Sequence, residues 1–252
     1  MDTTTISLPG GTDIEVRRRG SGPPLLFLHG MDGILFCEPF LSQLEQRYEV
    51  IVPHHPRWGE SPRTQRCTSV DDLAYVHLDL LASLEQPVPV VGASLGAWIA
   101  LEMAVKDPRA ISSLVLVSPL GVKFSGHTTR EFLDLYATSR EEVRTAMYAD
   151  DPPDLSTLSD DEFLYLARAQ EAATFYTWEP YQHRPALRHL LHRVTPPALV
   201  VSGTRDGFVL REDHAGLLAR ELGARHETVD TGHRVEEQAP DELVALIEGF
   251  LA

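Results

Sequence analysis

The sequence predicts an α/β fold, with a mostly parallel sheet covered by helices on both faces. Two observations lead to this prediction. Short continuous apolar runs, several of them ending in glycine, alternate with helical patterns along most of the 252 residues. Such runs are typical of strands buried on both faces, and their alternation with helices is typical of a parallel sheet. The hydrophobic share of 43% suits an ordinary globular core.

The expected elements follow in chain order. Residues 5–20 alternate polar and apolar side chains around Pro9-Gly10-Gly11, which indicates an antiparallel hairpin. Ser69 and the acidic residues after it are suited to begin a helix. The buried strands are expected at 24–30, 48–55, 88–92, 111–119, 197–203 and 225–230, and the helices at 69–84, 95–108, 211–223 and 241–251.

The alternation stops in the middle of the chain. Between residues 121 and 192 the pattern is helical and rich in aromatic side chains, and no buried strand interrupts it. The helical stretches are expected at 131–148, 160–178 and 186–194. We therefore expect a core domain formed by residues 1–120 and 193–252, and a helical cap formed by residues 121–192.

Composition argues against several classes of partner. A net charge of −15 without a basic stripe argues against nucleic acid. No apolar run approaches the roughly 18 residues of a membrane span, and the N-terminus lacks the pattern of a secretory signal. We expect a cytoplasmic protein with no membrane partner. Cys37 and Cys67 lack metal-ligand spacing, so we expect reduced thiols and no metal site.

The stretch VVGASLGAW, residues 90–98, places Ser94 where a strand becomes a helix. A turn this abrupt strains the serine backbone, and Gly92 and Gly96 remove side chains that would collide there. The helix that begins at Leu95 points its N-terminal amides toward charge that develops near the serine. The pattern predicts a nucleophilic serine; the alternative is that the two glycines only form a tight turn.

A serine hydroxyl needs a base, and the base needs an acid to orient it. His233 follows the last expected strand in a glycine-containing loop, which singles it out among the eleven histidines. Asp206 follows the strand at 197–203, and Asp230 is the competing acid, three residues before His233. Because reactive groups gather beyond the carboxyl ends of parallel strands, we expect Ser94, His233 and Asp206 to form a catalytic triad.

Backbone amides complete the expected site. The strand at 24–30 ends in His29-Gly30, and the flexible glycine lets the next amide turn inward. Met31 N–H and Leu95 N–H are therefore the expected oxyanion hole, and Gly30 is expected to contact substrate. Loss of one such donor typically costs about 3 kcal/mol of transition-state stabilisation.

Together these motifs resemble the α/β-hydrolase family, in its serine hydrolase branch with a helical cap. His29-Gly30, residues 92–96, 203–206 and 232–233 fall in the family's order. The loop 53–62 resembles the D-x-P-G-x-G-x-S loop of the family, with His54 in place of the aspartate and Arg57 in place of a glycine. The resemblance implies an eight-stranded, mostly parallel sheet. It also implies hydrolysis through an acyl-enzyme, without a metal or an organic cofactor.

The resemblance leaves the substrate open. Our hypothesis is a small-molecule carboxylic ester with an apolar acyl or aryl group, bound under the cap with Trp178 in the pocket. A carbon–carbon bond hydrolase of dienone acids is the main alternative, because it uses the same order of Ser, Asp and His. A non-catalytic ligand-binding module, a lyase and a cofactor-free oxygenase are further alternatives on the same scaffold.

Overall fold

The computed structural model describes residues 2–126, 128–149 and 152–252, which form an eight-stranded sheet with helices on both faces. The order across the sheet is β1-β2-β4-β3-β5-β6-β7-β8. β2 pairs antiparallel with β1 and β4, and the other pairs are parallel. The predicted fold class is therefore confirmed. The strands are β1 (Asp2–Ser7), β2 (Asp13–Arg19), β3 (Pro24–Leu28), β4 (Glu49–Pro53), β5 (Val88–Ala93), β6 (Ile111–Val117), β7 (Ala198–Gly203) and β8 (Arg225–Val229).

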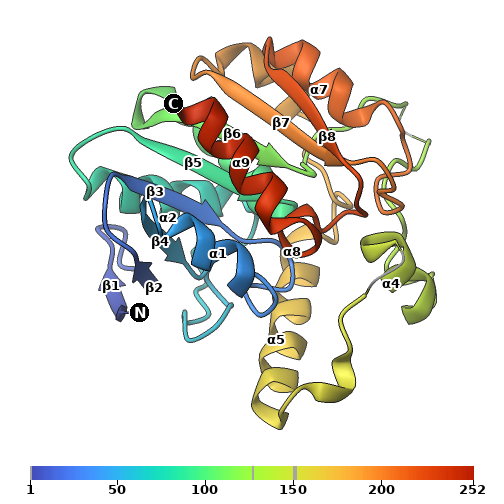
Figure 1. Cartoon of the computed structure of the whole chain (residues 1–252), viewed down its shortest axis with the longest axis horizontal. Coiled ribbons are helices and arrows are strands. Elements are labelled where there is room, and N and C mark those ends of the chain that lie inside the picture. Colours follow the sequence, from blue (N-terminus) through green and yellow to red (C-terminus); the bar gives the residue numbers. More distant parts are fainter. Residues whose placement is uncertain (1, 127, 150–151) are drawn as a thin grey trace.

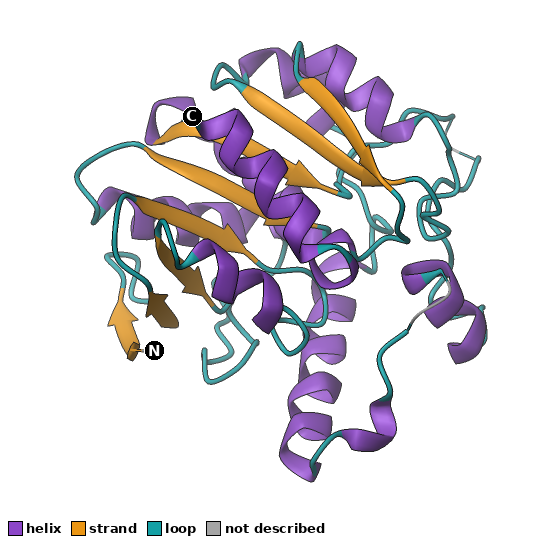
Figure 2. Ribbon diagram, in the orientation of Figure 1, coloured by secondary structure: helices purple, strands orange, loops and turns teal. Residues whose placement is uncertain are grey.

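Side chains of successive strand residues alternate between two apolar layers. Val91 packs in one layer, whereas Val90 packs in the other. α1 (Glu38–Leu44), α8 (Val235–Gln238) and α9 (Pro240–Leu251) cover the first face (Figure 2). α2 (Val70–Ala82), α3 (Leu95–Lys106) and α7 (His214–Leu222) cover the second face. Burial on both faces explains why these strands are continuous apolar runs in the sequence.

The parallel register brings several strand ends to one edge of the sheet. Gly92 on β5 lies opposite Leu28 on β3 and Leu116 on β6. The loops after β3, β5 and β6 therefore begin side by side, which is the place where α/β sheets carry their sites. β7 continues this edge, because Val201 pairs with Val117 on β6.

Between β6 and β7 the described residues form the α-helices α4 (Arg140–Tyr148), α5 (Asp160–Thr177) and α6 (Leu187–Leu190). Figure 1 shows α4 and α5 on the side toward which the arrows of the parallel strands point. Ser139 and Ser159 begin α4 and α5 with capping boxes, since each hydroxyl accepts the third helical N–H and that residue's glutamate accepts the serine N–H. The same device begins α2 at Ser69, as predicted.

The helix expected over 131–148 begins only at residue 140, so its first half was wrong. The chain is held outside a helix there by side-chain contacts. The Glu131 carboxylate accepts hydrogen bonds from the backbone N–H groups of Phe124 and Ser125, at 2.7 and 3.0 Å. Phe132 forms an isolated bridge with Val209. These contacts join residues before and after the segment, and local periodicity carries no sign of them.

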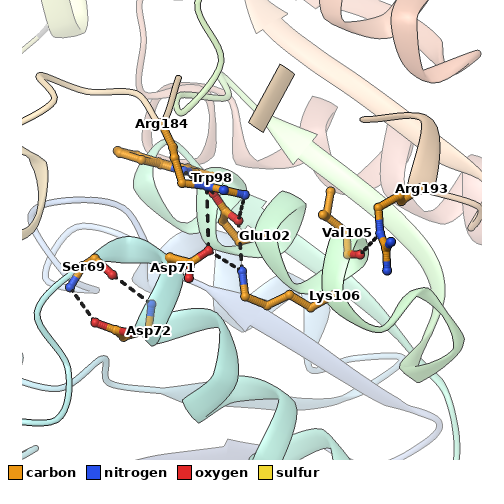
Figure 3. Close-up of polar contacts among 9 residues, drawn as sticks. All are labelled: Ser69, Asp71, Asp72, Trp98, Glu102, Val105, Lys106, Arg184 and Arg193. Atoms are coloured by element: carbon orange, nitrogen blue, oxygen red, sulfur yellow. Dashed lines mark hydrogen bonds and ion pairs between the residues drawn. The ribbon is translucent and has the colours of Figure 1, made fainter. Parts of the chain in front are cut away.

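A buried ion-pair network ties this middle segment to α3, the helix that follows Ser94 (Figure 3). Glu102 on α3 is fully buried and binds Arg184 through two hydrogen bonds of 2.6 and 2.7 Å. Lys106 binds the same carboxylate at 3.1 Å and also reaches Asp71 on α2 at 2.6 Å. Removing one member of such a pair leaves an uncompensated buried charge. The network therefore fixes the middle segment against the core.

In the part of the chain that the structure describes, no helix combines the length and the apolar character needed to cross a lipid bilayer.

Candidate active site

Ser94 lies at the turn between β5 and α3 with a backbone conformation that L-residues rarely adopt. Its φ is 53° and its ψ is −111°. Side chains on the flanking glycines would prevent this turn. A Cβ on Gly92 would overlap the backbone of Gly96, and a Cβ on Gly96 would overlap the carbonyl group of Leu28. The glycines therefore do more than permit a tight turn: they allow β3 and α3 to approach the serine closely.

The structure brings Ser94, His233 and Asp206 together. Ser94 Oγ lies 2.9 Å from His233 Nε2, and His233 Nδ1 lies 2.8 Å from Asp206 Oδ2. Because a carboxylate only accepts, Nδ1 carries the proton and Nε2 is free to accept the serine hydroxyl. Ser94 and His233 are buried, with 1% and 0% of their surfaces exposed.

Backbone donors hold the second oxygen of Asp206. Asp206 Oδ1 accepts hydrogen bonds from the N–H groups of Phe208 and Val209, at 2.9 and 3.0 Å. Burial alone would raise the pKa of Asp206. The adjacent His233 and the two backbone donors outweigh burial and hold this pKa below its usual value. The competing Asp230 points to solvent and pairs with Arg205 at 2.9 Å, so it does not contact His233.

The two backbone amides expected to form the oxyanion hole belong to Met31 and Leu95. Leu95 is the first residue of α3, where the backbone N–H has no acceptor within the helix. Met31 follows Gly30 in the loop after β3 and is 4% exposed. A Cβ on Gly30 would lie 3.4 Å from Ser94 Cβ and 2.8 Å from Arg234 Nη1. Gly30 therefore borders the serine, and a side chain there would fill the space in front of it.

A cavity of about 500 Å³ opens beside this site, between the core and the middle segment. Met31 and Arg234 are among its lining residues, whereas Ser94 and His233 are not, and the rest of its lining is mainly apolar. Trp178 is not brought to this cavity. Its indole is 55% exposed and packs edge-on against Tyr136. Trp178 is the C-cap residue of α5. The apolar side chains that line the cavity are Met31, Phe36, Leu135, Tyr136, Val143, Met147, Tyr148, Pro153, Leu155, Phe163, Leu166, Ala167 and Ala173.

Sequence reasoning missed a buried charged group next to His233. Arg234 directly follows His233, is 2% exposed and donates a hydrogen bond to Asp32. Tyr148 donates to Glu237 at 2.7 Å on the other side of Arg234. Burial raises the pKa of Glu237. The signal in the sequence was an arginine adjacent to His233, but only the fold shows that it turns inward.

The sheet order and the strained serine after β5 define a class of α/β folds that present a serine at a strand-to-helix turn. Residues 25–246 match the model of the family described as the alpha/beta hydrolase family. The chain belongs to this family.

Individual proteins are also similar in sequence to this chain. An uncharacterized protein of Mycobacterium tuberculosis is 36% identical over 108 residues, which are 42% of this chain and 32% of that protein. This match therefore spans about a third of the relative's length. Lipase LipV of the same species is 27% identical over 261 residues, covering 95% of this chain and 98% of the lipase.

A solved structure resembles the whole chain. It is a serine hydrolase involved in carbazole degradation, with a TM-score of 0.80 and 17% identity, and it covers 99% of this chain and 98% of its own. At this identity the likeness shows a common fold.

Proposed function

We propose that the protein is a serine hydrolase that cleaves carboxylic esters through an acyl-enzyme. The unbroken path of hydrogen bonds from Ser94 through His233 to Asp206, with lengths of 2.9 and 2.8 Å, carries this proposal. The family match and the full-length similarity to a lipase support it. We also propose that residues 121–192 act as a cap that roofs the cavity, because most of the residues lining it come from this segment.

The proposed reaction has two halves. His233 Nε2 takes the Ser94 proton as Oγ attacks the ester carbonyl carbon, and the resulting oxyanion is bound by the N–H groups of Met31 and Leu95. The imidazolium, paired with Asp206, then gives that proton to the leaving alkoxide, so the alcohol departs and an acyl-serine remains. Water, deprotonated by His233, hydrolyses the acyl-serine, releases the acid and restores the hydroxyl on Ser94.

The cavity favours an ester with an apolar acyl or aryl group. Its volume of about 500 Å³ suits a small molecule, and aliphatic and aromatic side chains provide most of its lining. Burial of apolar surface contributes about 25 cal/mol per Å², so this lining favours a substrate with an apolar body. Trp178 has no part in the proposed pocket because its side chain lies outside the cavity.

A turnover screen tests the proposal. The purified protein is assayed with short and long p-nitrophenyl esters, a thioester, an anilide and a dienone acid. The Ser94→Ala protein serves as the blank. We expect the esters to be turned over fastest and Ser94→Ala to lose at least 1,000-fold in kcat. Faster turnover of the dienone acid would favour the carbon–carbon hydrolase instead. Ester turnover that survives in Ser94→Ala would refute the assignment of the nucleophile.

A further inference from the structure

Three buried histidines next to the candidate site are linked by hydrogen bonds, one of which is accepted by the backbone carbonyl oxygen of the next histidine in the series. They are His29 after β3, His55 after β4 and His77 on α2, and each has 0% of its surface exposed. His77 Nε2 lies 2.7 Å from His55 Nδ1, and His55 Nε2 lies 3.1 Å from the carbonyl oxygen of His29. His29 Nδ1 lies 2.9 Å from the carbonyl oxygen of Gly30.

These contacts determine where each proton lies. A carbonyl oxygen only accepts, so His29 must carry its proton on Nδ1 and His55 must carry its proton on Nε2. His55 Nδ1 is then an acceptor, which requires His77 to carry its proton on Nε2. The backbone N–H of His55 lies 3.4 Å from His29 Nε2, which is unprotonated in this arrangement. Each neutral imidazole therefore donates one hydrogen bond: His77 to the His55 ring, His55 to the backbone carbonyl of His29, and His29 to the backbone carbonyl of Gly30.

The series of hydrogen bonds ends at the peptide bond between Gly30 and Met31, which presents the Met31 amide. In a trans peptide the carbonyl group of Gly30 and the N–H of Met31 point in opposite directions. The hydrogen bonds that the Gly30 carbonyl accepts from His29, at 2.9 Å, and from the Gly33 N–H, at 3.2 Å, therefore also set the direction of the Met31 N–H. The next peptide is held as well, because Trp58 Nε1 donates to the Met31 carbonyl at 2.9 Å.

We propose that His29, His55 and His77 are positioning residues that aim the Met31 N–H at the oxyanion. This inference rests on the proposed function, because it assigns the three histidines to the transition state of that reaction. None of the three would touch the substrate. His77 would act through the His55 ring, and His55 through the peptide between His29 and Gly30. The effect of removing a histidine should therefore decrease with its distance from Met31.

Variant kinetics provide the first test. Loss of one oxyanion donor costs about 100- to 1,000-fold in kcat. We therefore expect His29→Leu to lower kcat by about 100-fold, His55→Leu by about tenfold and His77→Leu by a few-fold. His55→Leu loses two side-chain hydrogen bonds, whereas His77→Leu loses one. KM should change by less than about threefold. A graded loss in kcat would support the inference, whereas equal losses in all three variants, or losses in KM alone, would overturn it.

A matched pair separates positioning from packing. The amide of His77→Gln can still donate to His55, whereas His77→Leu cannot. We expect His77→Gln to keep kcat and the affinity for a serine-directed boronic acid within about twofold of the wild type. His77→Leu should lose both in the same proportion, because the boronate mimics the tetrahedral intermediate. Equal kcat and equal boronic acid affinity in the two variants would contradict the inference.

Nitrogen NMR of the wild-type protein with labelled histidine tests the chain without any variant. At neutral pH we expect His29 to be protonated on Nδ1, and His55 and His77 on Nε2. The opposite tautomer at His29 would overturn the inference. This readout does not depend on catalysis. If Ser94→Ala kept full activity, the proposed function would fail while the tautomers stayed as expected, so the two failures are distinguishable.

Discussion

Acid should destabilise the protein through its buried histidines. Burial lowers the pKa of His29 to about 4 and the pKa of His77 to about 3, and it also lowers the pKa of His55. In the unfolded chain a histidine has a pKa near 6.5. The unfolded state therefore binds more protons between about pH 6.5 and 4. The stabilising contribution is complete above about pH 6.5 and is lost as the pH falls toward the folded-state values.

The size of the effect follows from linkage. One group titrating only in the unfolded state changes the free energy of unfolding by about 1.4 kcal/mol per pH unit. When the pH falls from about 7.5 to 5, His29 and His77 should each lower the free energy of unfolding by about 2 kcal/mol, and together by about 4 kcal/mol. Two charged groups lie near these histidines. Arg17 further lowers the pKa of His29, and the Glu15 carboxylate lies 3.9 Å from the neighbouring His54.

Urea unfolding followed by tryptophan fluorescence measures this effect in the wild type and in His77→Gln. Carboxylates contribute equally to both proteins, so the difference between the two isolates His77. From about pH 7.5 to 5, we expect the wild type to lose about 2 kcal/mol more than the variant. His189→Gln, at an exposed helical position, is the control and should follow the wild type. An identical pH dependence of the wild type and His77→Gln would show that His77 makes no contribution to the acid sensitivity.

Three further predictions concern the turn, the acid and the buried ion pair. Gly96→Ala should lower the free energy of unfolding by more than about 3 kcal/mol, because the added Cβ meets backbone atoms. Gly249→Ala, on a helix with open space around it, is the control and should raise the free energy of unfolding by about 0.5 kcal/mol. Similar melting temperatures of the two variants in thermal unfolding would contradict this prediction. Asp206→Asn should lower kcat by about 10,000-fold while the fold is kept, and a loss below tenfold would count against its role. Arg234→Met and Asp32→Asn should each destabilise by about 3 kcal/mol, and the double variant by clearly less than their sum in urea unfolding; strict additivity would exclude a coupled pair.

The fold could be predicted from the sequence because its signals are local. Strands buried on both faces appear as continuous apolar runs, and the serine that begins α2 is followed by the acid that completes its capping box. α1 was not predicted. It spans only seven residues, Glu38–Leu44, and two turns are too short to establish a helical pattern. Sequence periodicity therefore reveals long elements better than short ones.

The surroundings of the candidate site could not be predicted, because they depend on contacts between distant residues. His29 and His55 meet only because β3 and β4 are adjacent in parallel register, and His77 reaches them from α2. The sequence places Ser94 at a strand end. It does not reveal that Arg234 turns inward to meet Asp32, 202 positions away. Adjacent histidines in a loop and an arginine in a turn carry no sign of burial by themselves.

A fluorophosphonate probe followed by peptide mapping tests directly whether Ser94 is an activated nucleophile. The reagent labels a serine only when a neighbouring base activates it, which here would be His233 at 2.9 Å. We expect one labelled residue, Ser94, and at least a 100-fold slower reaction in His233→Ala. Label on another residue, or an unchanged rate in His233→Ala, would contradict it.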